Sequence, residues 1–169
     1  AAGTESMSIM PQIMGNKISL NPAIFEKDEN LGIAFGMGLT AEKVAQQWKV
    51  SREEQDAFAV QSNQRAAAAI AAGAFRDEIS PYTVRTHVPG EGGTVRISER
   101  ICDTDEGPRG DATLQSLGKL RPVFAARGSV TAGNSSQMSD GAGAVLLMSE
   151  AAVKRYGVTP IARFCSYSV

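Results

Sequence analysis

Length, composition and charge already exclude several classes of protein. The 169 residues suffice for one domain, or for one domain and part of a second, because domains usually contain about 100–200 residues. The formal net charge is −1, from 17 basic and 18 acidic side chains, which excludes the strongly basic surface of a dedicated nucleic-acid binder. No apolar run approaches the roughly 20 residues that cross a bilayer, so we expect no membrane span.

Cysteine and histidine are too sparse for a metal centre. Cys102 and Cys165 lie far apart and follow no metal-ligand spacing, and His87 is the single histidine. A structural zinc ion needs a set of such ligands at short, regular spacing, so no bound metal is expected. The few cysteines also fit a reducing compartment without proving one.

Both ends of the sequence resemble cuts within a longer chain. The first residues, AAGTESMS, contain neither an initiator methionine nor a hydrophobic leader, and residues 163–169 alternate like a strand that stops abruptly. We therefore expect an internal fragment. Because a targeting signal cannot be judged from such an end, the compartment stays open at this point.

The first fifth of the chain is rich in turn residues. Residues 1–8 have the pattern of a strand that runs into a glycine and serine turn. Residues 9–36 contain turn dipeptides at 10–11, 15–16 and 21–22, which predict an irregular excursion with little regular structure. Loops of this length are usually functional, disordered or insertions.

Two helices are predicted next. Thr40 is the expected N-cap of the first, and an apolar face at i, i+3, i+4 and i+7 places Trp48 in the core; its members are Ala41, Val44, Ala45 and Trp48. The second starts with SREE at 51–54, a capping box, and runs rich in alanine to Gly73, which suits the C′ position. The alanines suggest close packing against a neighbour.

The middle of the chain predicts a hairpin and a short helix. β-prone runs at 82–88 and 94–97 flank a glycine-rich turn, and His87 is expected to face solvent on the first strand. A charged loop at 103–109 follows and ends in Arg109. A short helix should start near Thr113 and end before the proline at position 122.

Residues 128–150 are the most informative stretch. Residues 128–136 are almost all small, which lets the backbone approach a ligand or another backbone closely. The apolar run at 144–148 is typical of a strand buried on both faces. A glycine-spaced loop before such a strand is a frequent ligand site in α/β proteins, while a tight turn that only needs small residues is the alternative. A helix at 150–156 and a last strand complete an α/β unit.

Five motifs, in order, resemble those of the thiolase family, specifically the 3-ketoacyl-CoA thiolases and acetyl-CoA acetyltransferases. They are AGTESMS at 2–8, MGLTAE at 37–42, DEGPR at 105–109, KLRPVF at 119–124 and GSVTAGNSSQMSDGAGAVLLMSE at 128–150. The capped helix that starts SREEQD at 51–56 also matches. Each motif is weak alone, but together they cover nearly the whole chain.

The resemblance implies an α/β fold of two related βαβαβαββ halves packed into a five-layered sandwich, with a loop domain inserted in the first half. On this basis residues 1–8 end a strand of the N-terminal half. Residues 9–127 form the loop domain, which covers CoA and often helps to build tetramers. Residues 128–157 return to the N-terminal half and supply a linking helix, and residues 158–169 are the first strand of the C-terminal half.

The activity implied by the resemblance is acyl transfer between a 3-oxoacyl-CoA and CoA in fatty-acid β-oxidation, which yields acetyl-CoA and a shortened acyl-CoA. Thiolases use a nucleophilic cysteine, a second cysteine and histidines. The family's motifs for these residues fall before residue 1 or after residue 169, so neither Cys102 nor Cys165 is assigned a catalytic role. The chain alone is expected to be inactive, and CoA enters as a substrate with no covalently bound cofactor.

The resemblance also implies a CoA-binding surface. Arg109 matches an arginine near the nucleotide, where a guanidinium pairs with phosphate or stacks on adenine. Ser116 matches a hydroxyl donor, and Ala132 and Ser136 match positions along the pantetheine arm. Met37 matches a methionine of the substrate pocket; Gly36 precedes it where acetoacetyl-specific relatives have a histidine, which leaves the chain-length preference open. The alternatives are a solvent ion pair for Arg109, helix capping for Ser116 and core filling for Met37.

The expected partners are acyl-CoA and CoA, with self-association into a homodimer or homotetramer. A bacterial cytoplasm is the favoured location, with peroxisomes and mitochondria as alternatives. A different reading is a complete, non-catalytic module that binds CoA or another subunit. A thiolase-like lipid-transfer or condensing protein fits less well, because such relatives usually lack the pairing of Thr40-Ala41-Glu42 with TAGN at 131–134.

Overall fold

The computed structural model describes residues 1–9 and 20–168, and its contacts divide the chain into two units. The first unit contains Ala1–Ser19 and Met138–Val169, and the second contains Leu20–Gln137. The predicted boundaries lay elsewhere, after residues 8, 127 and 157. Assignment of these segments to the halves and the loop domain of a larger fold remains a prediction.

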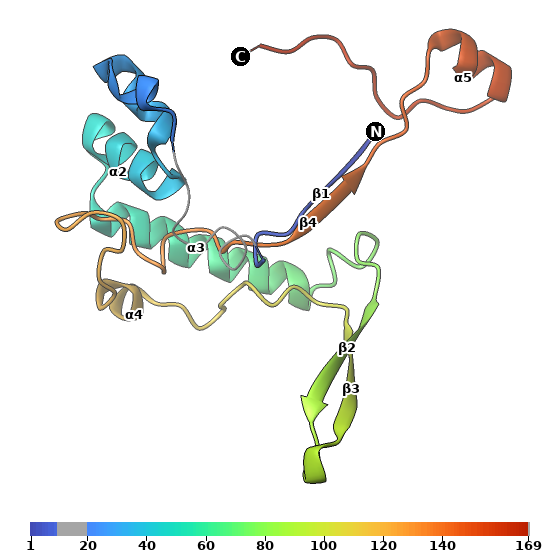
Figure 1. The fold of residues 1–169 in the computed structure, drawn as a ribbon, viewed down its shortest axis with the longest axis horizontal. Helices are drawn as coiled ribbons and strands as arrows, with labels where there is room; N and C mark the ends of the chain where they lie inside the picture. The colour runs from blue at the N-terminus through green and yellow to red at the C-terminus, as the bar shows by residue number, and fades with distance from the viewer. Residues whose placement is uncertain (10–19, 169) are drawn as a thin grey trace. The chain divides into compact units, whose positions relative to one another are not determined.

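A two-stranded sheet forms the centre of the first unit. Strand β1 (Ala2–Glu5) pairs antiparallel with β4 (Gly141–Ala144), as Figure 1 shows. Beyond the strands, Ala1 and Val145 exchange two more hydrogen bonds of 2.8 Å each. The carboxylate of Asp140 accepts bonds from the backbone N–H and the hydroxyl of Ser8, at 2.9 and 2.8 Å. The turn after β1 is thereby held to the residues that lead into β4.

Two strand predictions in this unit are wrong. A strand was expected at 144–148, but the strand in this region is β4, which ends at Ala144. The apolar residues that follow it are exposed, and Leu146 is 82% accessible. The ladder with β1 stops at Val145, and a strand needs a partner to satisfy its backbone groups. Residues 158–168 of the expected last strand have no regular secondary structure and pair with no described segment.

The helix predicted at 150–156 is confirmed as α5 (Glu150–Tyr156). The hydroxyl of Ser149 caps it by accepting a bond from the N–H of Ala152 at 3.2 Å. Gly157 ends it with φ of 61°, a left-handed conformation that glycine adopts without steric cost.

The second unit opens with short helical turns. Two 3₁₀ helices, η1 (Pro22–Phe25) and η2 (Asp28–Ala34), occupy the described end of the region predicted to be irregular. The turn signals at 10–11 and 15–16 lie outside the described residues. Because 3₁₀ helices occupy 22–25 and 28–34, the prediction of little regular structure is wrong for residues 20–36, although neither an α-helix nor a strand forms there.

The first predicted α-helix exists, but with a different start and a different buried face. Helix α2 (Met37–Trp48) begins after Gly36, so Thr40 is not its N-cap. Trp48 is 63% exposed rather than in the core. Glu42 and Ala45 are the buried residues of the helix instead. This face is buried because other residues of the second unit donate hydrogen bonds to it.

The second predicted helix is confirmed as α3 (Arg52–Ala71). The N–H of Glu54 donates to the hydroxyl of Ser51 at 3.2 Å, and the N–H of Ser51 donates to the carboxylate of Glu54 at 2.8 Å, which completes the capping box. Gly73 follows the end of the helix with φ of 71°. The alanines of α3 let the backbone at Gly110 approach the helix closely, since a Cβ added to Gly110 would lie 3.0 Å from the Cβ of Ala67.

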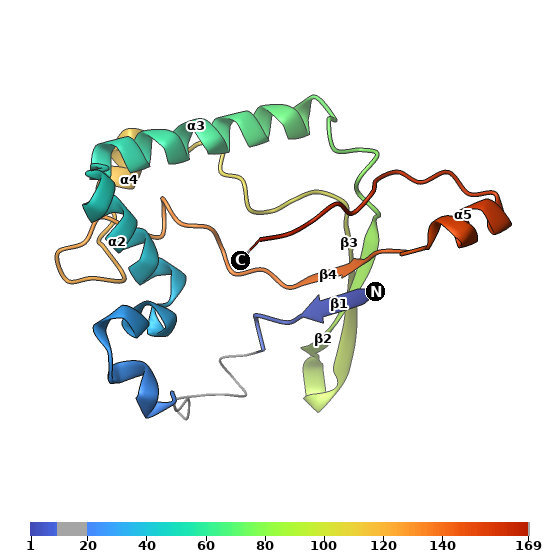
Figure 2. The same cartoon turned by 90° about the horizontal axis from the view of Figure 1, so that it is seen from above.

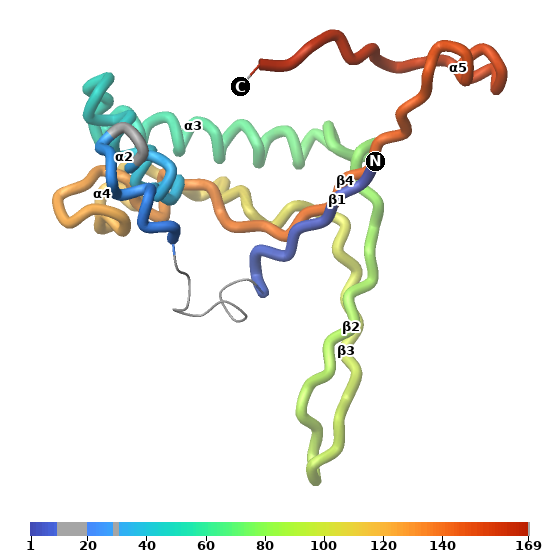
Figure 3. Tube along the Cα trace, turned by 45° about the horizontal axis from the view of Figure 1, so that its top comes forward, coloured from blue at the N-terminus to red at the C-terminus, as the bar shows by residue number. Residues whose placement is uncertain are grey.

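The predicted hairpin is also confirmed. Strands β2 (Tyr82–Pro89) and β3 (Val95–Cys102) pair antiparallel along their whole length around the 3₁₀ turn η3 (Glu91–Gly93), as Figure 3 traces. Strand β3 extends further than the run at 94–97 suggested. His87 is exposed on β2, as expected.

A small core joins α3 to α4 (Leu114–Gly118), the short helix expected from Thr113. Ala59, Ala112 and Leu117 form this core, with Val60 packed against it. Figure 2 shows α4 beside the N-terminal part of α3. Within the described residues, no helix combines the length and apolar character needed to cross a membrane.

Replacing Ser51 by alanine should lower the free energy of unfolding by about 1 kcal/mol, because the N–H of Glu54 loses its acceptor. Denaturant titration followed by circular dichroism measures the change. Ser62→Ala is the matched control, since Ser62 is exposed within the same helix and its loss should alter stability by less than about 0.5 kcal/mol. Equal effects of the two substitutions would contradict the capping role.

Candidate functional site

The small-residue loop at 128–137 lies against α2 and is fastened by a buried carboxylate. Glu42 is only 5% exposed. One of its oxygens accepts bonds from the backbone N–H groups of Ser129 and Val130 at 3.0 and 2.9 Å. The other accepts the N–H and the hydroxyl of Ser129 at 3.0 and 3.2 Å. Two successive peptide groups of the loop are therefore oriented by one side chain.

The charge state of Glu42 follows from this environment. Burial raises the pKa of the carboxyl, but the bonds from the N–H groups of Ser129 and Val130 and from the Ser129 hydroxyl outweigh it, so the pKa lies below its ordinary value. The carboxylate is ionised at neutral pH and needs these donors, because a buried charge without partners is costly.

Gly128, the first residue of the loop, must be a glycine because the carboxylate of Glu42 lies so close to it. A Cβ added at Gly128 would lie 2.1 Å from an oxygen of Glu42, a distance at which the carboxylate or the backbone must move. Gly133 is also confined, since a Cβ there would lie 2.6 Å from the side chain of Leu120 and 3.0 Å from that of Leu117. Small residues thus bring the loop close to both α2 and α4.

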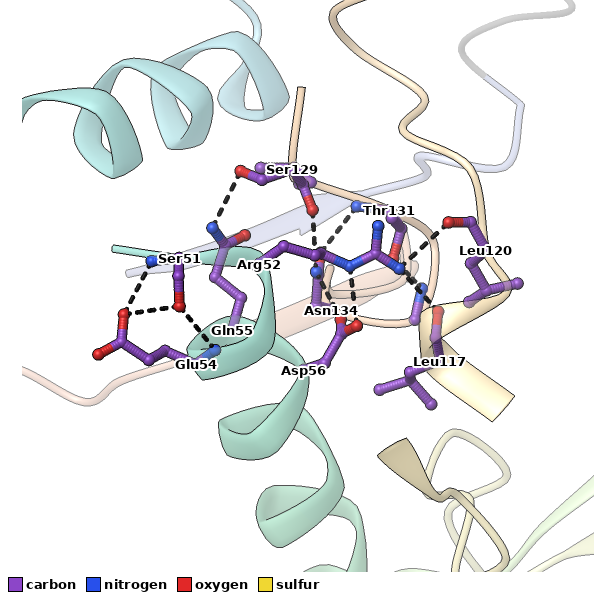
Figure 4. Close-up of polar contacts among 12 residues, drawn as sticks. Ser51, Arg52, Glu54, Gln55, Asp56, Leu117, Leu120, Ser129, Thr131 and Asn134 are labelled. Atoms are coloured by element: carbon purple, nitrogen blue, oxygen red, sulfur yellow. Dashed lines mark hydrogen bonds and ion pairs between the residues drawn. The ribbon is translucent and has the colours of Figure 1, made fainter. Parts of the chain in front are cut away.

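Hydrogen bonds inside the loop shape its exposed part (Figure 4). Thr131 is fully buried, with 0% exposure, and its N–H donates to the side-chain oxygen of Asn134 at 2.7 Å. The N–H of Gly133 donates to the Thr131 hydroxyl at 3.2 Å, and Ser135 donates to the Thr131 carbonyl at 2.7 Å. The backbone therefore turns tightly after Thr131 and leaves Ala132 exposed.

Helix α3 holds the loop from its other side. Gln55 donates to the hydroxyl of Ser129 at 2.9 Å, and Asn134 donates to the carboxylate of Asp56 at 2.9 Å. Asp56 also forms an ion pair with Arg52 at 2.8 Å. Figure 4 shows these side chains converging between the start of α3, the loop and α4.

About two turns further along α3, Asn63 fastens the segment that carries Arg109. Its side-chain oxygen accepts the N–H of Arg109 at 2.8 Å, while its amide donates to the carbonyl of Ala59 at 2.9 Å. The carbonyl of Arg109 accepts the N–H of Ala112 at 3.1 Å. The backbone at Arg109 is thus tied both to α3 and to the residues leading into α4.

The predicted CoA-binding residues lie on these anchored segments. Arg109, Ser116, Ala132 and Ser136 are all exposed. Within the described part of the chain the guanidinium of Arg109 has no hydrogen-bond or ion-pair partner, which does not support a solvent ion pair. Their joint role in binding CoA stays a prediction.

The structure bears on two of the alternatives. The hydroxyl of Ser116 accepts the N–H of Thr113 at 3.0 Å and donates to its carbonyl at 2.9 Å, so Ser116 does cap α4. Met37 is 79% exposed at the start of α2, so it fills no core within the described chain. A pocket role for Met37 remains a prediction.

A separate hollow lies away from these residues. A cavity of about 310 Å³ opens beyond the C-terminal end of α3; among its lining residues are Ile70, Phe75, Arg76 and Asp103. None of the predicted site residues lines it. Among the described residues no group of His, Cys, Asp and Glu side chains could hold a metal ion, and Cys102 and Cys165 are free thiols.

Sequence reasoning missed the residues that hold the loop in place. Glu42 was part of a motif, but an acidic residue on a predicted helix is usually assigned to solvent. The signal for Asp56 was the i, i+4 spacing from Arg52, which is typical of helix ion pairs in general. Neither pattern indicates burial, because the donors come from the loop at 128–137.

Glu42→Gln should lower the free energy of unfolding at neutral pH by about 1–3 kcal/mol, since the amide would turn a donor toward a backbone N–H. In the wild type the folded-state pKa is depressed, so the stabilisation is complete above the ordinary value of 4.5 and is lost as the pH falls below it. The difference between the two proteins should therefore shrink as the pH falls below 4.5.

Denaturant titrations over a pH series measure this difference. Glu78→Gln is the control, because Glu78 is exposed and makes no side-chain hydrogen bond or ion pair within the described residues. Its substitution should leave stability at neutral pH nearly unchanged. A deficit for Glu42→Gln that does not vary with pH would contradict the assigned role of the charge.

Comparison with known proteins places these elements in a family. Residues 1–151 match the family model described as Thiolase, N-terminal domain. The chain is 46% identical to a 3-ketoacyl-CoA thiolase of Bacillus subtilis, over 100% of its own length and 42% of that protein's. It is 43% identical to an acetyl-CoA acetyltransferase of Paracoccus denitrificans, over 99% of the chain and 43% of that relative. The chain therefore spans about two fifths of these curated relatives.

Two solved thiolase structures are similar to the fold of this chain. The dimeric peroxisomal thiolase of Saccharomyces cerevisiae is similar with a TM-score of 0.64 and 38% sequence identity, over 84% of this chain and 34% of that one. A Bacillus anthracis acetyl-CoA acetyltransferase is similar with a TM-score of 0.59 and 42% identity, over 73% of this chain and 29% of that one. The order of motifs, the fold and both kinds of similarity agree: the chain belongs to the thiolase family and is part of an α/β thiolase fold.

Proposed function

We propose that the complete protein containing this chain is a thiolase-type acyltransferase of fatty-acid β-oxidation. It cleaves a 3-oxoacyl-CoA with CoA: the bond between the α-carbon and the 3-keto carbon breaks, the acyl group passes to the thiol of CoA, and acetyl-CoA leaves. The match of residues 1–151 to the thiolase N-terminal domain carries this proposal. The names of relatives such as the 3-ketoacyl-CoA thiolase of Bacillus subtilis support it.

In this proposal the chain contributes CoA-binding surface and no catalytic residue. Ala132 and Ser136 contact the pantetheine arm from a loop whose backbone is already held by Glu42 and by α3. A loop that is ordered before binding loses less conformational entropy when the ligand arrives. CoA is a substrate, and no cofactor is bound covalently.

Arg109 and Ser116 contact the same CoA molecule nearer its nucleotide. The exposed guanidinium of Arg109 is available to a phosphate or an adenine ring, and Asn63 fixes the backbone from which it projects. Ser116 already donates its single hydroxyl hydrogen to Thr113. Its oxygen also accepts the N–H and the hydroxyl of Thr113, so a bond from Ser116 to CoA must replace one of these contacts. Met37 lines the acyl pocket.

The proposal also covers the oligomeric state and the location of the complete protein. A homodimer or homotetramer in a bacterial cytoplasm is proposed, and a peroxisomal or mitochondrial location is the alternative. Large apolar side chains such as Trp48, Phe58 and Ile33 are exposed in the described chain, which favours a partner surface. This observation also suits the second candidate, a non-catalytic subunit-interaction module. An intact mass of the source protein near twice 17.8 kDa favours the enzyme.

The isolated chain of residues 1–169 should not catalyse thiolysis of acetoacetyl-CoA. An acyl-enzyme requires an activated nucleophile, and neither Cys102 nor Cys165 is assigned that role. The measurement is loss of the acetoacetyl-CoA absorbance in the presence of CoA, with the complete protein as the positive control. Turnover by purified 1–169 would refute the proposed division of roles.

Arg109→Ala in the complete protein should raise the KM for CoA about tenfold, as expected for loss of a charge-assisted bond, and should leave the rate of acyl-enzyme formation at saturating 3-oxoacyl-CoA unchanged. Steady-state thiolysis gives the KM, and a burst experiment without free CoA gives the acylation step. Arg96→Ala is the matched control, because Arg96 is exposed on β3 without an ion-pair partner among the described residues. A KM for CoA that equals that of the wild type would show the role to be wrongly assigned.

A further inference from the structure

A single buried carboxylate connects the two segments that the proposed function assigns to CoA. Asp56 on α3 is 4% exposed. One of its oxygens accepts the side-chain amide of Asn134 at 2.9 Å, and the other accepts Nε of Arg52 at 2.8 Å. Each oxygen therefore has a different partner: Asn134 belongs to the loop, and Arg52 on α3 binds the end of α4.

The first arm is the loop that carries Ala132 and Ser136. Asn134 receives the N–H of Thr131 through its side-chain oxygen and donates to the carbonyl of Ser129 at 3.2 Å as well as to Asp56. The side chain of Asn134 thus spans the tight turn, and its contact with Asp56 fixes that turn to α3.

The second arm is α4 and the residues before it. The guanidinium of Arg52 donates through Nη2 to the carbonyls of Leu117 and Leu120, at 2.7 and 3.1 Å. These carbonyls lie at and just after the end of α4, and that of Leu117 also accepts the N–H of Leu120 at 2.9 Å. Because α4 carries Ser116 and follows Arg109 directly, Arg52 holds the nucleotide side of the proposed site.

We propose, on the basis of the proposed function, that Asp56 is a positioning residue that sets the spacing between these two arms. Through Asn134 it holds the pantetheine side, and through Arg52 it holds the nucleotide side. One CoA molecule then contacts both arms without either arm moving. Asp56 does not touch the substrate in this arrangement.

A carboxylate is the only side chain of this size that suits the position. Both neighbours present N–H donors, and an ionised carboxyl accepts on both oxygens. An asparagine would turn its own donor toward either Arg52 or Asn134 and leave one contact broken. Asp56→Asn therefore disconnects one arm while it conserves the shape of the side chain.

The test uses the complete protein and two substrates, a 3-oxoacyl-CoA and the corresponding 3-oxoacyl-pantetheine thioester, which lacks the nucleotide. The readout is the ratio of their kcat/KM values, which measures how much the nucleotide contributes. In Asp56→Asn this ratio should fall about tenfold, as for loss of a charge-assisted bond. The loss should appear in the KM for the CoA substrate, with kcat nearly unchanged.

Asp77→Asn is the matched control, because Asp77 is exposed and has no side-chain partner among the described residues. If Asp56→Asn fails to fold, the same ratio is measured for Arg52→Lys. A lysine keeps the positive charge, but it lacks the planar group with which Arg52 binds Asp56 and both carbonyls at once. Arg65→Lys, exposed on the same helix, is its control.

A lowered ratio in a folded variant supports the proposal. An equal loss on both substrates, or an unchanged ratio, overturns it and leaves the proposed function intact. Absence of CoA-dependent turnover in the complete wild-type protein would overturn the proposed function and this inference together.

Discussion

Two buried carboxylates hold a loop that has no secondary structure of its own. Backbone N–H groups away from water need partners, and the residues at 128–137 find few within their own segment. Glu42 on α2 accepts the N–H groups of Ser129 and Val130, and Asp56 on α3 accepts the amide of Asn134. The two helices therefore serve mainly as rigid supports that present acceptors, and the loop takes its shape from them. Removal of Glu42 would leave the N–H groups of Ser129 and Val130 without their acceptor, and removal of Asp56 would break the bonds from Arg52 and Asn134.

The small residues of the loop are a consequence of this arrangement, and in the proposed function they also allow the ligand to approach. Gly128 leaves room for the carboxylate of Glu42, and Gly133 leaves room for Leu117 and Leu120. Thr131 is buried because its hydroxyl and carbonyl satisfy groups within the turn. The tight-turn explanation and the ligand explanation are thus compatible: the buried side of the loop needs small residues for packing, and its exposed side presents Ala132 and Ser136.

The same contacts explain how separate parts of the sequence act together. Helix α3 contacts the loop through Gln55 and Asp56, the end of α4 through Arg52, and the segment at Arg109 through Asn63. Every residue of the proposed CoA surface except Met37 lies on a segment fixed to this one helix. In the proposed function the bond-making groups come from other parts of the complete protein, which divides binding and chemistry between segments. Such a division requires the binding surface to be rigid, because small displacements at a site reduce rates strongly.

Contacts within a few residues determined most elements from the sequence alone. The capping box at Ser51, the glycine ends at Gly73 and Gly157 and the hairpin of β2 and β3 were predictable because their interactions are local. Family motifs identified the loop and its membership in the thiolases. The tertiary structure alone decided that Glu42 and Asp56 are buried, that Trp48 is exposed and that β4 ends at Ala144. These outcomes depend on partners far away in sequence, 87 residues from Glu42 to Ser129 and 78 from Asp56 to Asn134, and no local pattern encodes such distances.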